Sequence, residues 1–121
     1  MLRRPAWLDE LFLAIDAKDA DRFASFIAED GAFVFGNAPA VQGRQEIREA
    51  VAGFFASIRG LSHQVLGVAE EGAEVWLRGV VTYERHDGSK LTVPFSNYFE
   101  MQDGRVRHYQ IYVDASALYA A

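Results

Sequence analysis

The chain has 121 residues and no cysteine, which excludes disulfide bonds, thiolate metal sites and a cysteine nucleophile. Hydrophobic residues make up 50% and charged residues 24%, an ordinary globular balance, and the length predicts a single domain over residues 1–121. The net charge of −5 and the scattered basic residues give no reason to expect nucleic acid or an anionic membrane as a partner.

The N-terminal third of the chain predicts two helices and a short strand. Pro5 suits the first turn of the first helix, whose apolar residues recur at helical spacing: Leu8, Leu11, Phe12 and Ile15. Asp19 is placed to cap a short second helix that carries Phe23, Phe26 and Ile27 on one side. A strand is expected over 32–35. No apolar stretch is long enough for a signal peptide or a membrane span, so we expect a cytoplasmic protein.

A third helix is the clearest expectation. It begins at Gly43, ends near Gly60, and carries the apolar stripe Ile47, Val51, Phe54, Phe55 and Ile58. Beyond it, three hairpin signals carry glycines spaced sixteen residues apart, at Gly72, Gly88 and Gly104. The strands between them run about ten to twelve residues, long enough to require a twisted and curled sheet. Helices first and antiparallel strands afterwards predict an α+β fold.

Both faces of these strands carry apolar side chains. One face of the third long strand holds Phe95, Asn97, Phe99 and Met101, and the second strand places Val75, Leu77, Val81 and Tyr83 opposite Trp76, Val80 and Thr82. A sheet with one solvated face alternates more cleanly than this. We therefore expect a second copy of the chain to cover the outer face, giving a homodimer through the sheet.

The sequence holds no strong catalytic motif, such as a phosphate-binding loop, a dinucleotide fingerprint or a nucleophile elbow. The three histidines lack the paired spacing of a zinc site, so no metal and no cofactor is expected. His86 lies in a turn signal. For His63 and His108, on strands, a hydrogen-bonded structural role is the more frequent alternative to a ligand or a base.

Two polar residues stand within apolar strand sequence. Asn97 lies between Phe95 and Phe99, and a buried amide needs partners from the protein, water or a ligand. Asp114 closes the apolar run over 109–113, where an apolar cavity would disfavour its ionised form and prepare it for acid/base chemistry. The alternatives stay open: Asp114 caps the C-terminal turn at Ser116, and Asn97 bonds a neighbouring strand.

Five segments of the sequence resemble the SnoaL-like group of the nuclear-transport-factor-2-like superfamily. They are residues 17–21 between the first two helices, 26–31 before the first strand, 42–47 opening the third helix, 97–106, and 111–114. The resemblance implies a cone-shaped, cystatin-like α+β barrel, whose curved, mostly antiparallel sheet wraps around three N-terminal helices. It also implies a homodimer through the sheet and a pocket between the concave face and the helices.

Two enzymes of that superfamily match only in part. The resemblance aligns three residues of ketosteroid isomerase with this chain: its general-base aspartate with Phe35, its oxyanion-hole aspartate with Asn97 and its helix tyrosine with Leu11. In that enzyme the surroundings of the carboxyl groups set their pKa values. In limonene epoxide hydrolase, the closing aspartate resembles Asp114, but the arginine and second aspartate fall near Gly79 and Val81. An isomerase of the first type is disfavoured, and the triad of the second type is broken.

The leading hypothesis is a pocket protein for an apolar, planar small molecule that performs cofactor-free acid/base chemistry. Asp114 would be the proton donor or acceptor and Asn97 would orient the substrate. The substrate-binding side chains would come from His63, Tyr83, Tyr112, Phe35, Phe54, Trp7 and Phe12. The rival hypothesis is a non-catalytic ligand-binding or dimerisation module.

Overall fold

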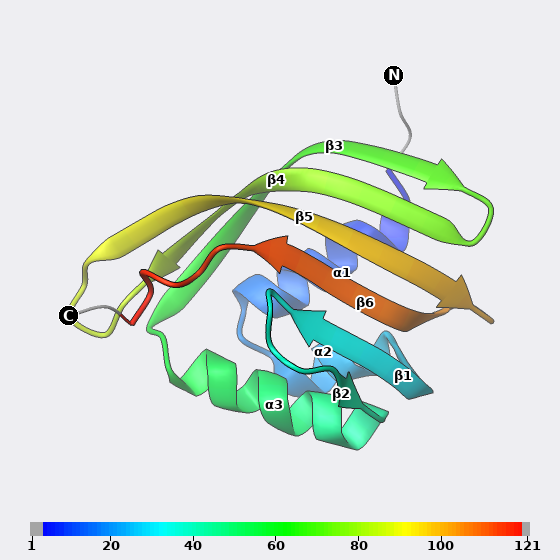
Figure 1. Ribbon diagram of the computed structural model, residues 1–121, viewed down its shortest axis with the longest axis horizontal. Coiled ribbons are helices and arrows are strands. Elements are labelled where there is room, and N and C mark those ends of the chain that lie inside the picture. The colour runs from blue at the N-terminus through cyan, green and yellow to red at the C-terminus, as the bar shows by residue number, and fades with distance from the viewer. Residues whose placement is uncertain (1–3, 120–121) are drawn as a thin grey trace.

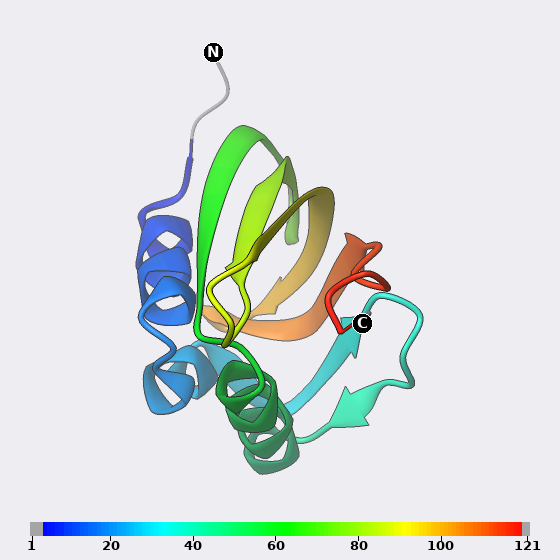
Figure 2. The ribbon, with the colours of Figure 1, turned by 90° about the vertical axis from the view of Figure 1, so that its left-hand side faces the viewer.

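A computed structural model describes residues 4–119. Two helices come first, two strands lie between the second and third helices, and four long strands then complete a curved sheet (Figures 1 and 2). The elements are α1 (Ala6–Asp16), α2 (Ala20–Ser25), β1 (Ile27–Phe35), β2 (Val41–Gln42), α3 (Arg44–Ala56), β3 (Gly60–Glu71), β4 (Glu74–Glu84), β5 (Lys90–Gln102) and β6 (Arg105–Val113). The predicted α+β class and the predicted N-terminal helices are confirmed.

The sheet has the strand order β2-β1-β6-β5-β4-β3. All neighbouring strands pair antiparallel except β1 and β6, which run parallel. The three predicted hairpins are confirmed, and their glycines adopt positive φ angles: +58° at Gly72, +88° at Gly88 and +78° at Gly104. Side chains larger than hydrogen disfavour this backbone region, which is why glycine marks these turns in the sequence.

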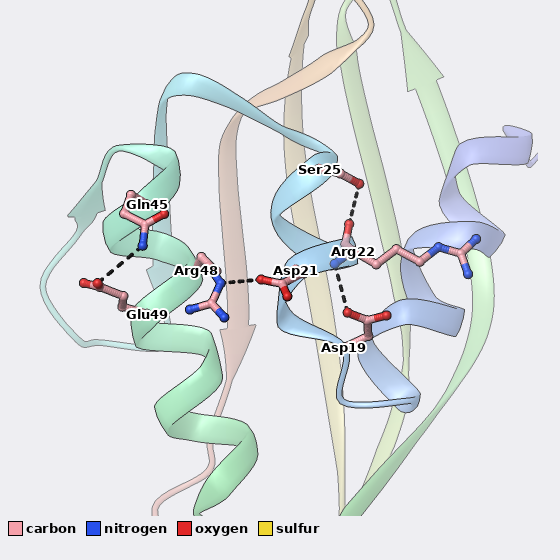
Figure 3. A network of polar contacts seen from close by, with 7 residues as sticks. All are labelled: Asp19, Asp21, Arg22, Ser25, Gln45, Arg48 and Glu49. Atoms are coloured by element: carbon pink, nitrogen blue, oxygen red, sulfur yellow. Dashed lines mark hydrogen bonds and ion pairs between the residues drawn. The ribbon is translucent and has the colours of Figure 1, made fainter.

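Helix α2 is shorter than its apolar pattern predicts. Asp19 caps it as expected, because its carboxylate accepts a hydrogen bond from the backbone N–H of Arg22 at 3.0 Å (Figure 3). The placement of Phe26 and Ile27 on this helix is wrong, because the helix ends at Ser25 and Ile27 opens β1. Residues distant in the sequence bond their carbonyl oxygens: Val106 N–H donates to Phe26 O at 2.8 Å, and Arg44 Nε donates to Ile27 O at 2.8 Å.

Polar contacts hold α3 against the two shorter helices. Arg48 on α3 forms an ion pair with Asp21 on α2, and Figure 3 shows the two side chains facing each other across the gap between the helices. At the other end of α3, Lys18 Nζ donates to the carbonyl oxygens of Phe55 at 3.2 Å and Ile58 at 2.9 Å. Phe55 O otherwise accepts only a long bond of 3.4 Å from Ile58 N–H, so the ammonium supplies a further donor that caps the helix C-terminus.

The core lies between the concave face of the sheet and the helices. Figure 2 shows α1 beside β3 and α3 below the sheet, so that the curved strands and the helices enclose one interior. Its members come from every helix and from β1, β3, β4, β5 and β6, and they include Leu8, Leu11, Phe23, Ile47, Phe55, Val75, Phe99 and Tyr109. Asn97 on β5 pairs with Leu77 on β4 and with Ile111 on β6, so these three side chains lie side by side on the same face of the sheet.

Candidate functional site

A largely apolar cavity lies inside the domain, between the sheet and all three helices. The volume open to a water-sized sphere is about 50 Å³, and the empty space that includes the opening to solvent is about 480 Å³. The lining residues are Ile15, Phe23, Phe33, Phe35, Val51, Phe54, Phe55, Leu61, His63, Val81, Tyr83, Phe95, Asn97, Tyr109 and Ile111. None of them is Lys, Arg, Asp or Glu. Aromatic walls with few polar groups are typical of sites for small organic molecules.

His63 on β3 is the one histidine among these lining residues, and Asp16 at the end of α1 holds it in place. The ring Nδ1 lies 2.6 Å from Asp16 Oδ1, and the His63 backbone N–H donates to Asp16 Oδ2 at 3.1 Å. Both carboxylate oxygens thus bond the same residue. An acceptor at Nδ1 selects the tautomer that carries its proton there, which leaves Nε2 with a free lone pair.

Aromatic rings pack against the imidazole and restrict its motion. The His63 ring centroid lies 4.9 Å from that of Phe12 and 5.2 Å from that of Phe95. The His63 side chain retains 11% of its exposed area, while that of Asp16 retains 29%. The pair is therefore enclosed on the histidine side and partly open to solvent on the carboxylate side.

Asn97 on β5 is the one buried polar residue in the described part of the chain, with 1% of its surface exposed. Its Oδ1 is completely enclosed and has no hydrogen-bond partner among residues 4–119. A buried carbonyl oxygen without a partner costs free energy, and native proteins usually satisfy such groups. An unsatisfied amide beside an apolar cavity therefore marks a place where a bound molecule completes the hydrogen bonding.

Two tyrosines add hydroxyl groups to the cavity. Burial, with a smaller effect from Tyr119, raises the pKa of Tyr83 to about 12. Burial also raises the pKa of Tyr109 far above its usual range, with a smaller effect from Tyr83. Both phenols are therefore protonated at neutral pH, and each offers an O–H donor without bringing a charge into the apolar interior.

We expect Tyr83 to ionise late and to make the fold sensitive to alkali. Its pKa in the folded chain lies above the ordinary value of 10.0, so the unfolded chain loses this proton first. Stability is therefore retained below pH 10 and falls as the pH rises towards 12. Phenolate absorbance combined with denaturant midpoints at each pH measures both effects. Tyr83→Phe should remove one late-ionising phenol, and a late titration unchanged in this variant would contradict the expectation.

The structure brings together five of the nine residues predicted for the site: Asn97, His63, Tyr83, Phe35 and Phe54 all line the cavity. Trp7 and Phe12 do not line it. Trp7 packs edge-on against Phe99 deeper in the core, with 5.4 Å between ring centroids. Phe12 lies against the His63 ring and supports it.

The prediction that Asp114 points into the cavity with Asn97 is wrong. Asp114 is exposed on a surface groove at the end of β6, and its Oδ1 accepts a hydrogen bond from Ser116 N–H at 3.1 Å. Hydrogen bonding to the Ser116 side chain and, to a smaller extent, to its backbone N–H lowers the pKa of the Asp114 carboxyl, whereas the catalytic hypothesis required the ionised form to be disfavoured. The turn-capping alternative is the one that the geometry supports.

The prediction that Tyr112 lines the cavity is also wrong, because Tyr112 lies on the outer face of β6. Asn97 pairs with Ile111 across the β5–β6 hairpin, so after the register shift near Arg107 the residues 109, 111 and 113 of β6 face inward. Tyr112 therefore faces outward, is 48% exposed and lines the same groove as Asp114. Residues 112 and 114 share a face, and that face is the outer one.

Asp16 and Tyr109 were missed as site residues. Asp16 falls on the polar side of the first helix, where a solvated carboxylate is the usual outcome, and only the packing of that helix across β3 brings it to His63. Tyr109 has a detectable signal, because it shares the inner face with Ile111. Of the other histidines, His108 contacts Tyr98 and Gln110, and His86 bonds the backbone of Ala56. Within residues 4–119 no cluster of three potential metal ligands occurs.

A protein-family model described as a SnoaL-like domain matches residues 8–109. The chain belongs to this SnoaL-like family. The resemblance aligns the general base of ketosteroid isomerase with Phe35 and an aspartate of limonene epoxide hydrolase with Val81. Both residues are apolar here, and both line the cavity. No curated protein sequence matches the chain. No helix of the described residues is long and apolar enough to cross a membrane.

The fold is similar to those of solved structures described as NTF2-like and cystatin-fold proteins. A hypothetical protein from Catenulispora acidiphila with a ketosteroid isomerase-like fold, in complex with trimethylamine, is 18% identical with a TM-score of 0.88 over 98% of this chain and 92% of that one. A putative SnoaL-like polyketide cyclase from Jannaschia is 21% identical with a TM-score of 0.79 over 100% and 96%. An epoxide hydrolase of the LEH-like type from M. tuberculosis is 15% identical with a TM-score of 0.78 over 90% and 80%. At these identities the similarity establishes the fold.

Proposed function

We propose that this SnoaL-like domain binds an apolar, planar small molecule and transfers protons on it without a cofactor, with His63 as the acid/base group. The observation that carries the proposal is the hydrogen bond of 2.6 Å between His63 Nδ1 and Asp16 Oδ1 at the wall of an aromatic cavity. A carboxylate on Nδ1 fixes the tautomer and stabilises the imidazolium that forms when Nε2 accepts a proton.

The other polar groups have roles that follow from their charge state. The neutral hydroxyls of Tyr83 and Tyr109 are suited to donate to an oxygen on which negative charge develops after proton removal. Asn97 supplies an uncharged anchor. Asp114, exposed and bonded to Ser116, has no part in this chemistry. The proposal thus keeps the type of reaction expected from the sequence and moves its acid/base group from Asp114 to His63.

The test is proton abstraction from 5-nitrobenzisoxazole, a planar aromatic probe. Removal of its C3 proton by a base breaks the N–O bond and forms a nitrile and a coloured phenolate, so no co-reactant is needed. We expect saturable turnover that depends on the His63 side chain. Binding of the probe without turnover above that of His63→Gln would instead indicate the non-catalytic binding module.

We further propose that a second copy of the chain covers the outer face of the sheet. Trp76, Tyr98 and His108 form a row of rings across β4, β5 and β6, with centroids 4.6 Å and 5.8 Å apart. Trp76 is 44% exposed and Leu66 on β3 is 48% exposed. Half-exposed aromatic side chains on one face suit the core of an interface.

Sedimentation or light scattering at micromolar concentration tests the dimer. We expect a mass twice that of the chain, with about 800 Å² buried per partner. Trp76→Arg should yield a folded monomer, whereas Arg107→Ala, at the exposed end of the same sheet, should leave the dimer intact. A monomeric wild-type protein would contradict the proposal.

A further inference from the structure

The unsatisfied oxygen of Asn97 restricts the kind of molecule that the cavity binds. Asn97 Oδ1 is enclosed and has no donor within the described chain, although β4 and β6 flank its strand on both sides. The side chains paired with it on those strands are Leu77 and Ile111, which carry no donors. The paired side chains therefore leave this oxygen unsatisfied, and a molecule bound in the cavity is a source of the missing donor.

The rest of the cavity disfavours charged groups on the ligand. Its lining holds no Lys or Arg, so a carboxylate or phosphate on the ligand would be buried without a counter-charge. The carboxylate of Asp16, which contacts the lining residue His63, is already hydrogen-bonded to it. Eight Phe and Tyr side chains supply flat apolar contact from several directions. A neutral aromatic molecule with one polar hydrogen fits this combination.

We infer that Asn97 is a specificity-determining residue that selects planar ligands carrying an N–H or O–H donor over equally shaped ligands that carry only an acceptor. This inference rests on the proposed function, since it specifies the substrate class of the same cavity. A bound donor gives Oδ1 its missing hydrogen bond, whereas a bound acceptor leaves Oδ1 without one. Sites that hydrogen-bond a ligand group discriminate strongly against an analogue that lacks it.

Indole and benzofuran are the matched probes, because they share one shape and differ only by an N–H donor in place of a ring oxygen acceptor. Their dissociation constants for the full chain are measured by ligand-observed NMR. We expect indole to bind about tenfold more tightly than benzofuran, the ratio that one well-placed buried hydrogen bond provides. In Asn97→Leu the ratio should fall to about one, because leucine offers neither donor nor acceptor. Tyr98→Phe, a neighbour that faces outward, should keep the wild-type ratio.

Each outcome decides the matter. Equal affinities in the wild type, or tighter binding of benzofuran, would overturn the inference and leave the proposed function standing. A preference for indole that persists in Asn97→Leu would also overturn it, because another group such as His63 would then recognise the donor. Failure of both probes to bind at millimolar concentration would remove the small-molecule function itself, and the inference with it. If Asn97→Leu does not fold, Asn97→Ala takes its place, and the wild-type ratio alone already decides between donor and acceptor.

Discussion

Replacement of His63 by Gln is expected to lower kcat for ring opening of 5-nitrobenzisoxazole by about 10²-fold or more, with KM changed little. A positioned general base contributes about 10²–10⁴-fold to a proton transfer, and glutamine keeps the size and polarity of histidine without a titratable lone pair. His108→Gln is the matched control, because His108 lies on the outer face with Tyr98 and Gln110. An equal loss in both variants, or no loss in His63→Gln, would contradict the role of His63.

Asp16 acts on this chemistry only through His63, as a positioning residue. In Asp16→Asn the side chain keeps one acceptor oxygen but loses the charge that stabilises the imidazolium, so kcat should fall while KM is retained. Nitrogen-15 NMR of the imidazole supplies a second readout. In the wild type the Nδ1-protonated tautomer should dominate, and in Asp16→Ala the usual preference for the Nε2-protonated form should return. A variant that merely loosened the fold would change neither the tautomer nor the ratio of kcat to KM in this way.

The fold follows from local signals, which explains why it was predictable. Helical spacing in 8–15 and 47–58 and glycine turns at 72, 88 and 104 are properties of short segments, and the structure confirms them. The parallel pairing of β1 with β6 joins residues about 75 positions apart and has no local signature. It also explains the error at Phe26 and Ile27, where an apolar helical pattern yields to a strand with distant partners.

The site was predictable only where strand alternation decides the outcome. Asn97 shares a face with Phe95 and Phe99, so its burial could be inferred from the sequence. The position of Asp114 depended on the register of the β5–β6 hairpin, and a shift by one residue reverses every side chain. The pairing of Asn97 with Ile111 excludes residue 114 from the inner face. The contact between Asp16 and His63 joins a helix end to a strand 47 residues away, and no spacing rule reaches that far.

Gly79 links the packing of the sheet to the geometry of the site. It is buried on β4, opposite Phe95, and β3 carries a bulge beside it between Val65 and Gly67. A Cβ atom at this position would overlap the backbone oxygen of Gln64 and would lie 2.9 Å from Cε1 of Phe95. The Phe95 ring in turn contacts the His63 ring. The absence of a side chain at residue 79 thus lets two strands and the aromatic support of His63 approach one another.

Gly79→Ala is expected to lower the free energy of unfolding by about 3 kcal/mol, near the upper end of the usual cost of overpacking, because the atom that it meets first is backbone and has little freedom to move. Denaturant unfolding measures this loss. Gly67→Ala is the control: its Cβ would lie 3.6 Å from Arg78 Nε, an ordinary contact on the edge strand, so its effect should stay within about 0.5 kcal/mol. If Gly79→Ala folds, the displaced Phe95 ring should also shift the His63 imidazole and reduce turnover of the benzisoxazole probe. Equal stability of the two glycine variants would show that β3 and the Phe95 ring adjust freely, and the rigid support proposed for His63 would then be wrong.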